Sequence, residues 1–246
     1  MNAGVATRGE VRTSDPRMLA RLTGLFFLLT TLAGVIAQVT ISQRLIVSTD
    51  ADATATNILS QEGLFQLGFT IYLVEMASQV ITTVLFYQLL RPVNGTVALA
   101  AALLQLTGVV IKAFARVFYI APLFVLQGPA ALHGFSPEQL QSLTLVLLSV
   151  NDAGAAMALA FFGFSTILNG YLIFRSAFLP RWLGVLSVVA GFGWLTFLYP
   201  PLGHGAFTVV ALLGLIGSVA TILWFLFVGV NDRKWKEQLA AIAPAT

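Results

Sequence analysis

Residues 97–120 of the chain read VALAAALLQLTGVVIKAFARVFYI. A helix that spans a bilayer needs about 20 mainly apolar residues, and this stretch supplies them without a proline. Two cations, Lys112 and Arg116, lie four residues apart within it, which places them on one face of a helix. Because ionisable side chains inside a membrane are costly, each needs a partner or a function. The stretch therefore predicts a membrane-spanning helix and marks where a site should be sought.

The composition of the whole chain agrees with this stretch. Of its 246 residues, 58% are hydrophobic and 9% are charged, and the mean hydropathy is +0.89. Soluble domains carry roughly 45–50% apolar and about 25% charged residues. So few charges cannot cover the surface of a soluble chain, which argues against a soluble enzyme, a disordered chain and a nucleic-acid binder. The chain has no cysteine, which excludes disulfides, thiolate metal sites and a cysteine nucleophile.

The fold class predicted from these patterns is all-α, a polytopic membrane protein with a bundle of six transmembrane helices. Pro92, Pro180 and Pro200 separate neighbouring apolar stretches, because proline cannot continue a helix. The first apolar stretch is longer than the apolar core of about 7–15 residues in a signal peptide, so we expect it to remain as a span. One membrane domain, residues 22–230, then lies between tails 1–21 and 231–246, with spans at about 22–41, 64–90, 97–120, 152–174, 182–199 and 206–230.

The basic residues predict the orientation of the bundle. Arg44 alone lies in a loop on one side, Lys112 and Arg116 lie within a span, and the other ten of the thirteen lie on the opposite side. Loops that face the cytoplasm carry an excess of Lys and Arg, so both termini are predicted to be cytoplasmic. The ten residues of that side are Arg8, Arg12, Arg17, Arg21, Arg91, Arg175, Arg181, Arg233, Lys234 and Lys236.

The outer loops and the membrane interfaces carry further local signals. Residues 49–62 are polar enough for a short surface helix. Ser136 followed by Pro137 and Gln139 predicts a helix start with a capping box; unbroken from Pro137 to residue 174, that helix would be about 57 Å long, which requires a bend or an extension outside the membrane. Tyr119 and Trp235 fall where interfacial aromatic anchors are expected.

Six polar residues within or at the mouths of the spans are the candidate ligand-binding residues. Counted from the cytoplasmic helix ends at 1.5 Å per residue, their depths match in pairs. We predict that they form a polar seam between the second, third and fourth spans that opens outward. The predicted pairs are Glu75 with Lys112 at about 22–24 Å, Arg116 with Asp152 at about 30–33 Å, and Gln79 with Gln105 at about 15 Å.

The same seam allows three readings. Buried polar pairs can hold helices together, at an average of about 0.6 kcal/mol for each hydrogen bond. They can instead line a pocket for a ligand or ion, or form a catalytic site. The two histidines, His133 and His204, lie in predicted loops, and a zinc site needs three or four ligands. The sequence therefore predicts neither a metal site, a cofactor nor catalytic residues.

Several stretches resemble a bacterial multi-pass membrane-protein family catalogued as domain of unknown function 4386. Most of them lie at the cytoplasmic ends of the predicted helices, and together they run from the first span through the fifth. The resemblance implies an integral membrane protein of about six spans. It supplies no activity, substrate or site residue. The stretches are residues 20–24, 53–60, 62–65, 87–94, 170–176, 178–181 and 183–186.

Three functions stay open on the sequence alone. We favour a non-enzymatic protein whose seam binds, and in one version transports, a small molecule or ion. The alternatives are a structural or accessory subunit with a dry seam, and an intramembrane lipid-modifying enzyme that uses Glu75 or Asp152 as acid or base. The expected location is the cytoplasmic (inner) membrane. The expected partners are the bilayer, anionic lipid headgroups at the cytoplasmic face and a second copy of the chain, with no nucleic acid.

Overall fold

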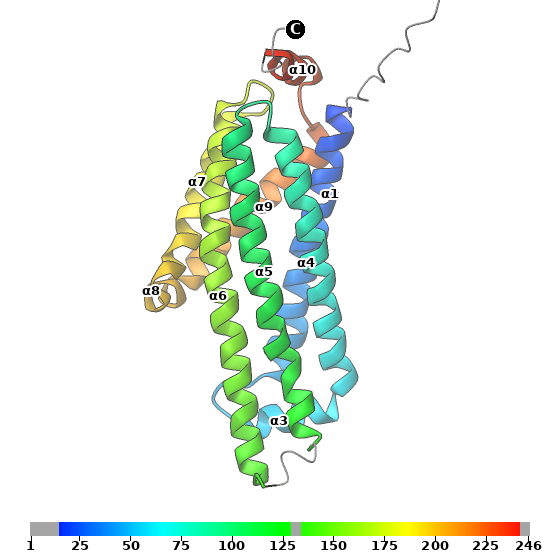
Figure 1. Ribbon diagram of the computed structural model, residues 1–246, viewed down its shortest axis with the longest axis vertical. Helices are drawn as coiled ribbons and strands as arrows, with labels where there is room; N and C mark the ends of the chain where they lie inside the picture. Colours follow the sequence, from blue (N-terminus) through cyan, green and yellow to red (C-terminus); the bar gives the residue numbers. More distant parts are fainter. Residues whose placement is uncertain (1–14, 129–133, 242–246) are drawn as a thin grey trace, which may run out of the picture.

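The computed structural model describes residues 15–128 and 134–241, and all regular structure in these ranges is helical (Figure 1). Six helical stretches are long and apolar enough to cross a membrane, which confirms the predicted fold class of a multi-pass membrane protein. They are α1 (Pro16–Val35) with η1 (Ile36–Ser42) and α2 (Gln43–Leu45), α4 (Glu62–Leu90), α5 (Gly95–Leu126), α6 (Pro137–Arg175), α7 (Arg181–Leu195) with η3 (Thr196–Leu198), and α9 (Phe207–Leu223) with η4 (Trp224–Val228).

The long helices begin where the sequence supplies caps. The Asn94 side chain accepts a hydrogen bond from the Val97 amide at 3.0 Å, and Ser136 and Gln139 form the predicted capping box of α6. These contacts satisfy backbone N–H groups that the first turn leaves free. α6 is unbroken over 39 residues, about 58 Å. It therefore begins well before residue 152 and extends beyond a hydrocarbon core of about 30 Å.

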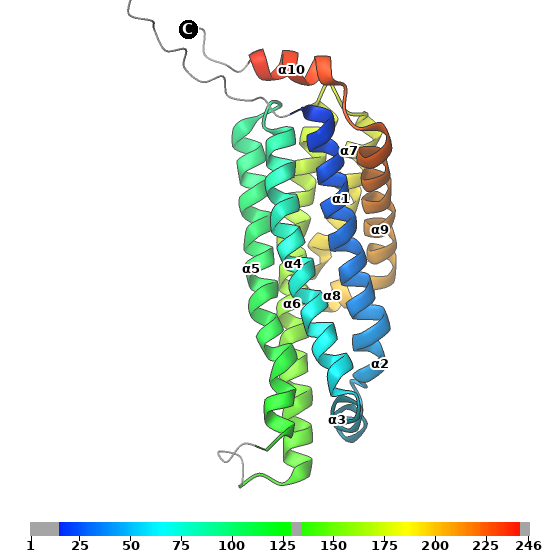
Figure 2. The ribbon, with the colours of Figure 1, turned by 90° about the vertical axis from the view of Figure 1, so that its right-hand side faces the viewer.

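The six spanning stretches form a closed ring. α1 packs against α4, α4 against α5, α5 against α6, α6 against α7, α7 against α9, and α9 against α1 (Figures 1 and 2). Large apolar side chains point outward from this ring; Val110 and Phe114 of α5, for example, are 66% and 67% exposed. Such a surface suits contact with lipid, and the inner faces of the ring are left to enclose a site.

Glycines bring α6 and α7 into backbone contact. A Cβ on Gly184 would lie 2.6 Å from the carbonyl oxygen of Gly170 and 2.6 Å from the backbone nitrogen of Phe174. A Cβ on Gly191 would lie 2.9 Å from the carbonyl oxygen of Gly163. Small residues at helix interfaces allow such close approach in membranes. The two contacts hold α7 in place as one wall of the ring.

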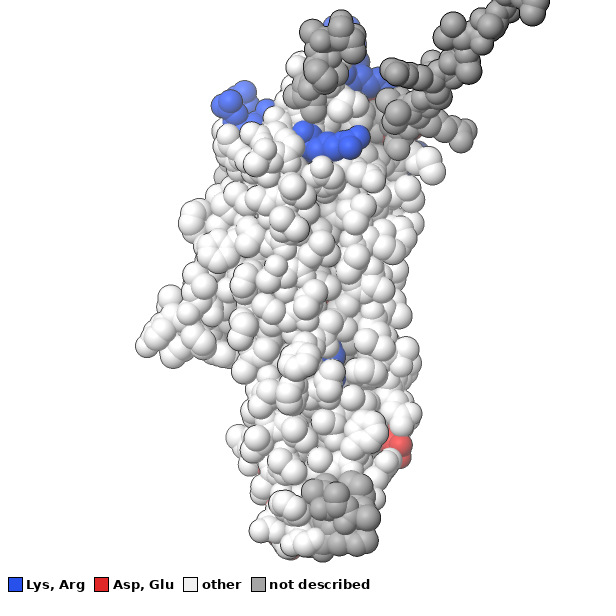
Figure 3. Space-filling model, viewed as in Figure 1, with Lys and Arg blue, Asp and Glu red and all other residues white. Residues whose placement is uncertain are grey.

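One end of the bundle gathers the basic side chains, as Figure 3 shows, and is called the basic end below. The beginnings of α1, α5 and α7, the ends of α4 and α6, and α10 (Asp232–Ala241) form it. Among the predicted cytoplasmic residues, Arg8 and Arg12 lie outside the described residues. The remaining eight are Arg17, Arg21, Arg91, Arg175, Arg181, Arg233, Lys234 and Lys236.

The helix α10 lies across the basic end (Figure 2). Trp235 is only 3% exposed, and its indole N–H donates to the carbonyl oxygen of Leu89 at 2.9 Å. The prediction that Trp235 is an interfacial anchor is therefore wrong: a buried indole needs a hydrogen-bond acceptor, and the end of α4 provides one. An ion pair between Arg17 and Asp232, at 2.9 Å, also holds α10 to α1.

Two short helices lie in connections between spanning stretches, one at the end opposite the basic end and one part-way along the bundle (Figure 1). α3 (Ala51–Ser60) is the predicted surface helix, and Asp50 caps it by accepting from the Ala53 amide at 2.9 Å. α8 (Pro200–Gly205) forms where the sequence predicts only a break, because its two prolines occupy the first positions of a helix, which proline tolerates.

Candidate functional site

Glu75 of α4 and Lys112 of α5 form an ion pair, as predicted. The two side chains are 6% and 16% exposed, respectively. Lys112 donates to Oε1 of Glu75, whereas Oε2 is buried and has no hydrogen-bond partner in the part of the chain that the structure describes. Because opposite charges that meet inside a membrane offset one another's cost, the pair joins α4 to α5.

Glu75 also lies against the backbone of α1. A Cβ on Gly34 would lie 3.1 Å from Oε1 and 3.2 Å from Cδ of the carboxyl group. Glycine at this position is thus what leaves room for the acid to reach Lys112.

Replacement of Gly34 with valine is expected to lower the free energy of unfolding by about 1–3 kcal/mol. The added methyl groups displace the carboxylate from Lys112. The measurement is denaturant unfolding of the purified protein, with Gly63→Val as the control, since a Cβ on Gly63 would meet nothing within 4 Å. Equal losses from the two substitutions would contradict the placement of Glu75 against α1.

Arg116 of α5 is buried, at 4% exposure, and is held from two sides. Its Nη1 donates to Oδ1 of Asn151 on α6 at 2.9 Å. Its guanidinium carbon lies 3.7 Å from the ring centre of Tyr72 on α4, where the ring's negative face attracts a cation. Arg116 therefore connects three helices of the ring.

The prediction that Arg116 pairs with Asp152 is wrong, because its partner is the adjacent residue, Asn151. Asn151 accepts from Arg116 and, through Nδ2, donates to Oδ1 of Asp152 at 2.9 Å. Successive residues of a helix are turned by about 100°, so Asn151 faces α5 and is 2% exposed, while Asp152 lies at the surface of the bundle. Asp152 reaches the cation only through the amide of Asn151.

A hydroxyl cluster, which the sequence analysis missed, completes this level of the bundle. The Tyr72 hydroxyl donates to Oε1 of Gln38 at 2.8 Å and lies 3.0 Å from Oγ of Ser42. Ser42 donates to the Tyr119 hydroxyl at 3.2 Å. Tyr119 is 1% exposed, so its prediction as an interfacial anchor is wrong. The spacing along each helix was a signal for this cluster. Tyr72 lies three residues from Glu75, and Tyr119 lies three residues from Arg116, so each tyrosine shares a helix face with an ionisable residue of the seam.

Gln38 and Ser42 belong to η1, a π-helical segment. Such segments are rare and are frequent at functional sites. The ion layer, defined here as Glu75, Lys112, Arg116, Asn151 and the Tyr72 ring, lies beside this irregular turn.

An apolar plug separates the ion layer from the basic half of the bundle. It consists of Met76, Val109, Ala158 and Phe162, all buried. Met76 of α4 and Val109 of α5 lie between the ion pair and the two glutamines, Gln79 and Gln105, along their helices, and the other two members come from α6. The plug thus lies between the ion layer and the space described next.

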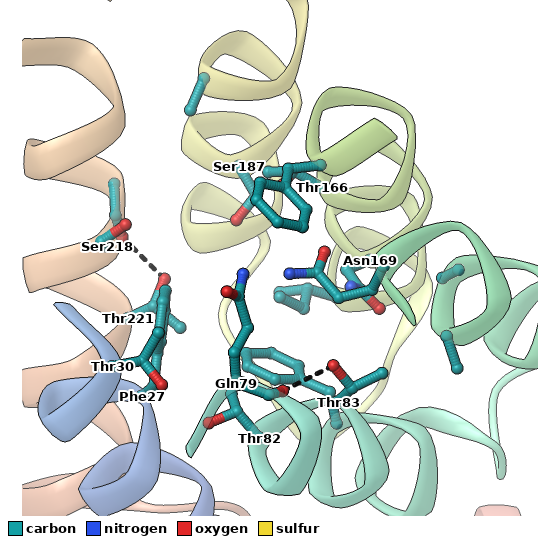
Figure 4. Close-up of a pocket in the computed structure, with 18 of the residues that line it drawn as sticks. Phe27, Thr30, Gln79, Thr82, Thr83, Thr166, Asn169, Ser187, Ser218 and Thr221 are labelled. Atoms are coloured by element: carbon teal, nitrogen blue, oxygen red, sulfur yellow. Dashed lines mark hydrogen bonds between the residues drawn. The ribbon is translucent and has the colours of Figure 1, made fainter. Parts of the chain in front are cut away.

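A cavity of about 190 Å³ lies between the apolar plug and the basic end, and all six spanning stretches contribute to its wall. Figure 4 shows Gln79 and Asn169 reaching into it from α4 and α6. Small side chains leave the space open, among them Ala102 of α5 and Gly217 of α9. The polar side chains of the wall are Thr30, Gln79, Thr82, Thr83, Gln105, Thr166, Asn169, Ser187, Ser218 and Thr221.

A buried apolar cluster lies between the cavity and the basic end. Its fully buried members include Leu90, Leu172, Leu183 and Phe225, from four different helical segments, and Trp235 of α10 also belongs to it. Apolar clusters therefore flank the cavity at both of its ends along the bundle axis.

Gln79 and Gln105 both line the cavity, but among the described residues there is no hydrogen bond between them. The structure also differs from the predicted seam in extent and position. The cavity involves α1, α7 and α9 as well as α4 to α6, and it lies nearer the basic end than the ion layer does. The predicted depths came from polar residues of α4, α5 and α6. They could not show that α1, α7 and α9 also contribute to the wall of the cavity.

The described part of the chain has no group of three His, Asp or Glu side chains that could hold a metal ion. His204 of α8 hydrogen-bonds through Nδ1 to the carbonyl oxygen of Pro200 at 2.7 Å, and His133 lies outside the described residues. The wall of the cavity can hold a molecule by hydrogen bonds and aromatic contacts.

A family model described as Domain of unknown function (DUF4386) matches residues 22–229. This range includes every residue of the ion layer, the apolar plug and the cavity wall. Comparisons with curated proteins and with solved structures found no match.

Proposed function

The chain belongs to the family described as Domain of unknown function (DUF4386), and we propose that it binds a small polar molecule in its central cavity. The observation that carries the proposal is the cavity wall, in which ten polar side chains from a ring of six helices surround about 190 Å³. Polar groups inside a membrane need hydrogen-bond partners. In this wall, Oε1 of Gln79 and Oγ1 of Thr30 are buried without one among the described residues, so a bound molecule supplies what the protein does not.

The alternative of a structural subunit with a dry seam fits the ion layer but not the cavity. Protein interiors are close-packed, with few voids larger than a water molecule. A helix bundle that serves only as a scaffold gains stability by filling such a space, and polar side chains around it add nothing to packing.

A cavity-filling substitution tests the proposal. We expect at least one member of a panel of small amides, alcohols and amines to raise the melting temperature of the purified wild-type protein. Ala102→Phe, which fills the cavity, should weaken that response by at least about tenfold in concentration. Leu103→Phe is the matched control, because Leu103 is 56% exposed on the outer face of the same helix. A wild-type protein that responds to nothing in the panel, or an Ala102→Phe variant that responds fully, would contradict the proposal.

We further propose that the basic end faces the cytoplasm and that the membrane is the cytoplasmic (inner) one. The excess of Lys and Arg at that end supports this orientation under the positive-inside rule. On α10, Arg233, Lys234 and Lys236 are exposed and are suited to anionic lipid headgroups, each contributing about 1 kcal/mol near a charged surface.

Carriage of the molecule across the membrane is a second candidate, which the apolar clusters on both sides of the cavity favour. Substrate sites of transporters lie between two gates that open in turn. A lone cysteine at Gln105 tests this, since the chain has no other cysteine. A carrier is expected to expose Gln105→Cys to an impermeant maleimide from both sides of oriented vesicles, with Ser136→Cys and Lys236→Cys reporting the two sides. Labelling from one side alone would contradict carriage and leave the binding proposal standing.

A further inference from the structure

We infer that the molecule bound in the cavity is a small organic ammonium ion, a protonated primary amine. This inference rests on the proposed function and names its ligand class. It follows from the hydrogen-bonding capacity of the cavity wall, from its aromatic rings and from the position of the nearest acid.

Four of the seven Ser and Thr hydroxyls of the wall donate their protons to backbone carbonyl groups. Thr82 donates to Ser78 at 2.8 Å, and Thr83 donates to Gln79 at 2.7 Å. In the same way Ser187 donates to the carbonyl oxygen one turn earlier in α7 at 2.9 Å, and Thr221 donates to the carbonyl oxygen one turn earlier in α9 at 2.8 Å. A hydroxyl has one proton, so toward the cavity these four side chains offer lone pairs only.

The amides of the wall add further acceptors. Nδ2 of Asn169 donates to Oγ of Ser165 at 3.4 Å, which leaves Oδ1 of Asn169 to accept. Oε1 of Gln79 is buried without a partner among the described residues, as is Oγ1 of Thr30, whose residue is 8% exposed. The unpaired amide oxygen of Gln79 calls for an N–H donor from the ligand, and a primary ammonium group carries three. The unpaired hydroxyl of Thr30 can accept from such a group as well as donate.

Aromatic rings on the same wall favour a cation. Phe27, Phe86, Tyr87, Phe162 and Trp194 all line the cavity, from α1, α4, α6 and α7. The faces of such rings attract ammonium groups, by about 2 kcal/mol or more where water is excluded. Among the described residues, no Lys or Arg lines the cavity to oppose this attraction.

The acid of the ion layer lies nearer the cavity than its basic partner does. Glu75 is one turn from Gln79 along α4, whereas Lys112 is two turns from Gln105 along α5. Lys112 reaches Oε1, and Oε2 of Glu75 has no partner among the described residues. Among the charged residues of the ion layer, Glu75 therefore has the backbone position nearest the cavity, and its carboxylate favours a positive charge there.

Three probes of similar size test the inference on the purified wild-type protein. tert-Butylammonium carries both charge and N–H groups, tert-butanol has the same shape without the charge, and tetramethylammonium has the charge without N–H groups. We expect tert-butylammonium to raise the melting temperature at a concentration at least about tenfold lower than tert-butanol does, with tetramethylammonium between them.

Variants locate the source of this preference. Glu75→Gln combined with Lys112→Gln, which keeps hydrogen-bonding groups without charge, is expected to reduce the advantage of tert-butylammonium by about threefold or more, because the carboxylate nearest the cavity is gone. Glu62→Gln, at the far end of α4, is the control and should keep the full advantage. The comparison of the three probes uses the wild-type protein alone, so it does not depend on whether a variant folds.

Equal responses to tert-butylammonium and tert-butanol would overturn the inference and leave the proposed binding function standing. A response to neither probe would also overturn it, and the Ala102→Phe comparison with the wider panel then decides the proposed function separately.

Discussion

Replacement of Glu75 with alanine is expected to lower the free energy of unfolding by about 3–5 kcal/mol. The substitution removes the only acid that Lys112 contacts among the described residues and leaves an ammonium group, 16% exposed, inside the bundle. A buried charge without its partner costs far more than the pair contributes when intact. Denaturant unfolding of the purified protein in micelles is the measurement.

Two companion variants separate this cause from simple loss of side-chain volume. Glu75→Leu with Lys112→Met removes both charges and should recover most of the lost stability, because apolar replacements of a buried pair are often neutral. Glu62→Ala, at the start of the same helix, should change stability by only about 0.5 kcal/mol. A double variant as unstable as Glu75→Ala would contradict the ion-pair account.

Replacement of Gly184 with leucine is expected to cost more than about 4 kcal/mol and to give little folded protein. Even a Cβ at this position would lie 2.6 Å from two backbone atoms of α6, the carbonyl oxygen of Gly170 and the nitrogen of Phe174. Backbone atoms cannot move aside as a flexible side chain can, so α6 and α7 must separate. Because Ser187 and Trp194 of α7 line the cavity, any protein that still folds should also lose ligand binding.

The adjacent residue provides the control for this substitution. Val185 is 49% exposed on the outer face of α7, so Val185→Leu should leave yield, melting temperature and ligand response close to the wild type. The measurement is the amount of monodisperse protein recovered from the membrane. A Gly184→Leu protein as abundant and as stable as Val185→Leu would contradict the close packing of α6 on α7.

Elements with strong periodic or compositional signals could be predicted from the sequence. The six spans follow from the length of their apolar runs, and Ser136 marks the start of α6 because its capping chemistry is local. The pairing of Glu75 with Lys112 could be predicted because two opposite charges at equal depth on successive helices have few other ways to be satisfied.

Features that depend on how helices face one another could not be predicted in this way. Depth alone does not tell Asn151 from Asp152, since adjacent residues share a depth and differ only in the direction they face. The cavity escaped notice because Ala102, Gly217 and other small residues of its wall have no polar signal of their own. The burial of Trp235 depends on α10 folding back onto the end of α4, which is a tertiary contact.

The central claim is that the cavity holds a ligand, and an experimental density map of the protein purified from its membrane tests it most directly. At a resolution that shows ordered water, we expect density that no part of the chain explains between Gln79 and Asn169, within hydrogen-bond distance of the free acceptor of each side chain. A collapsed cavity would contradict the account: Gln79 bonded to Gln105, apolar side chains filling the space, and no density between them.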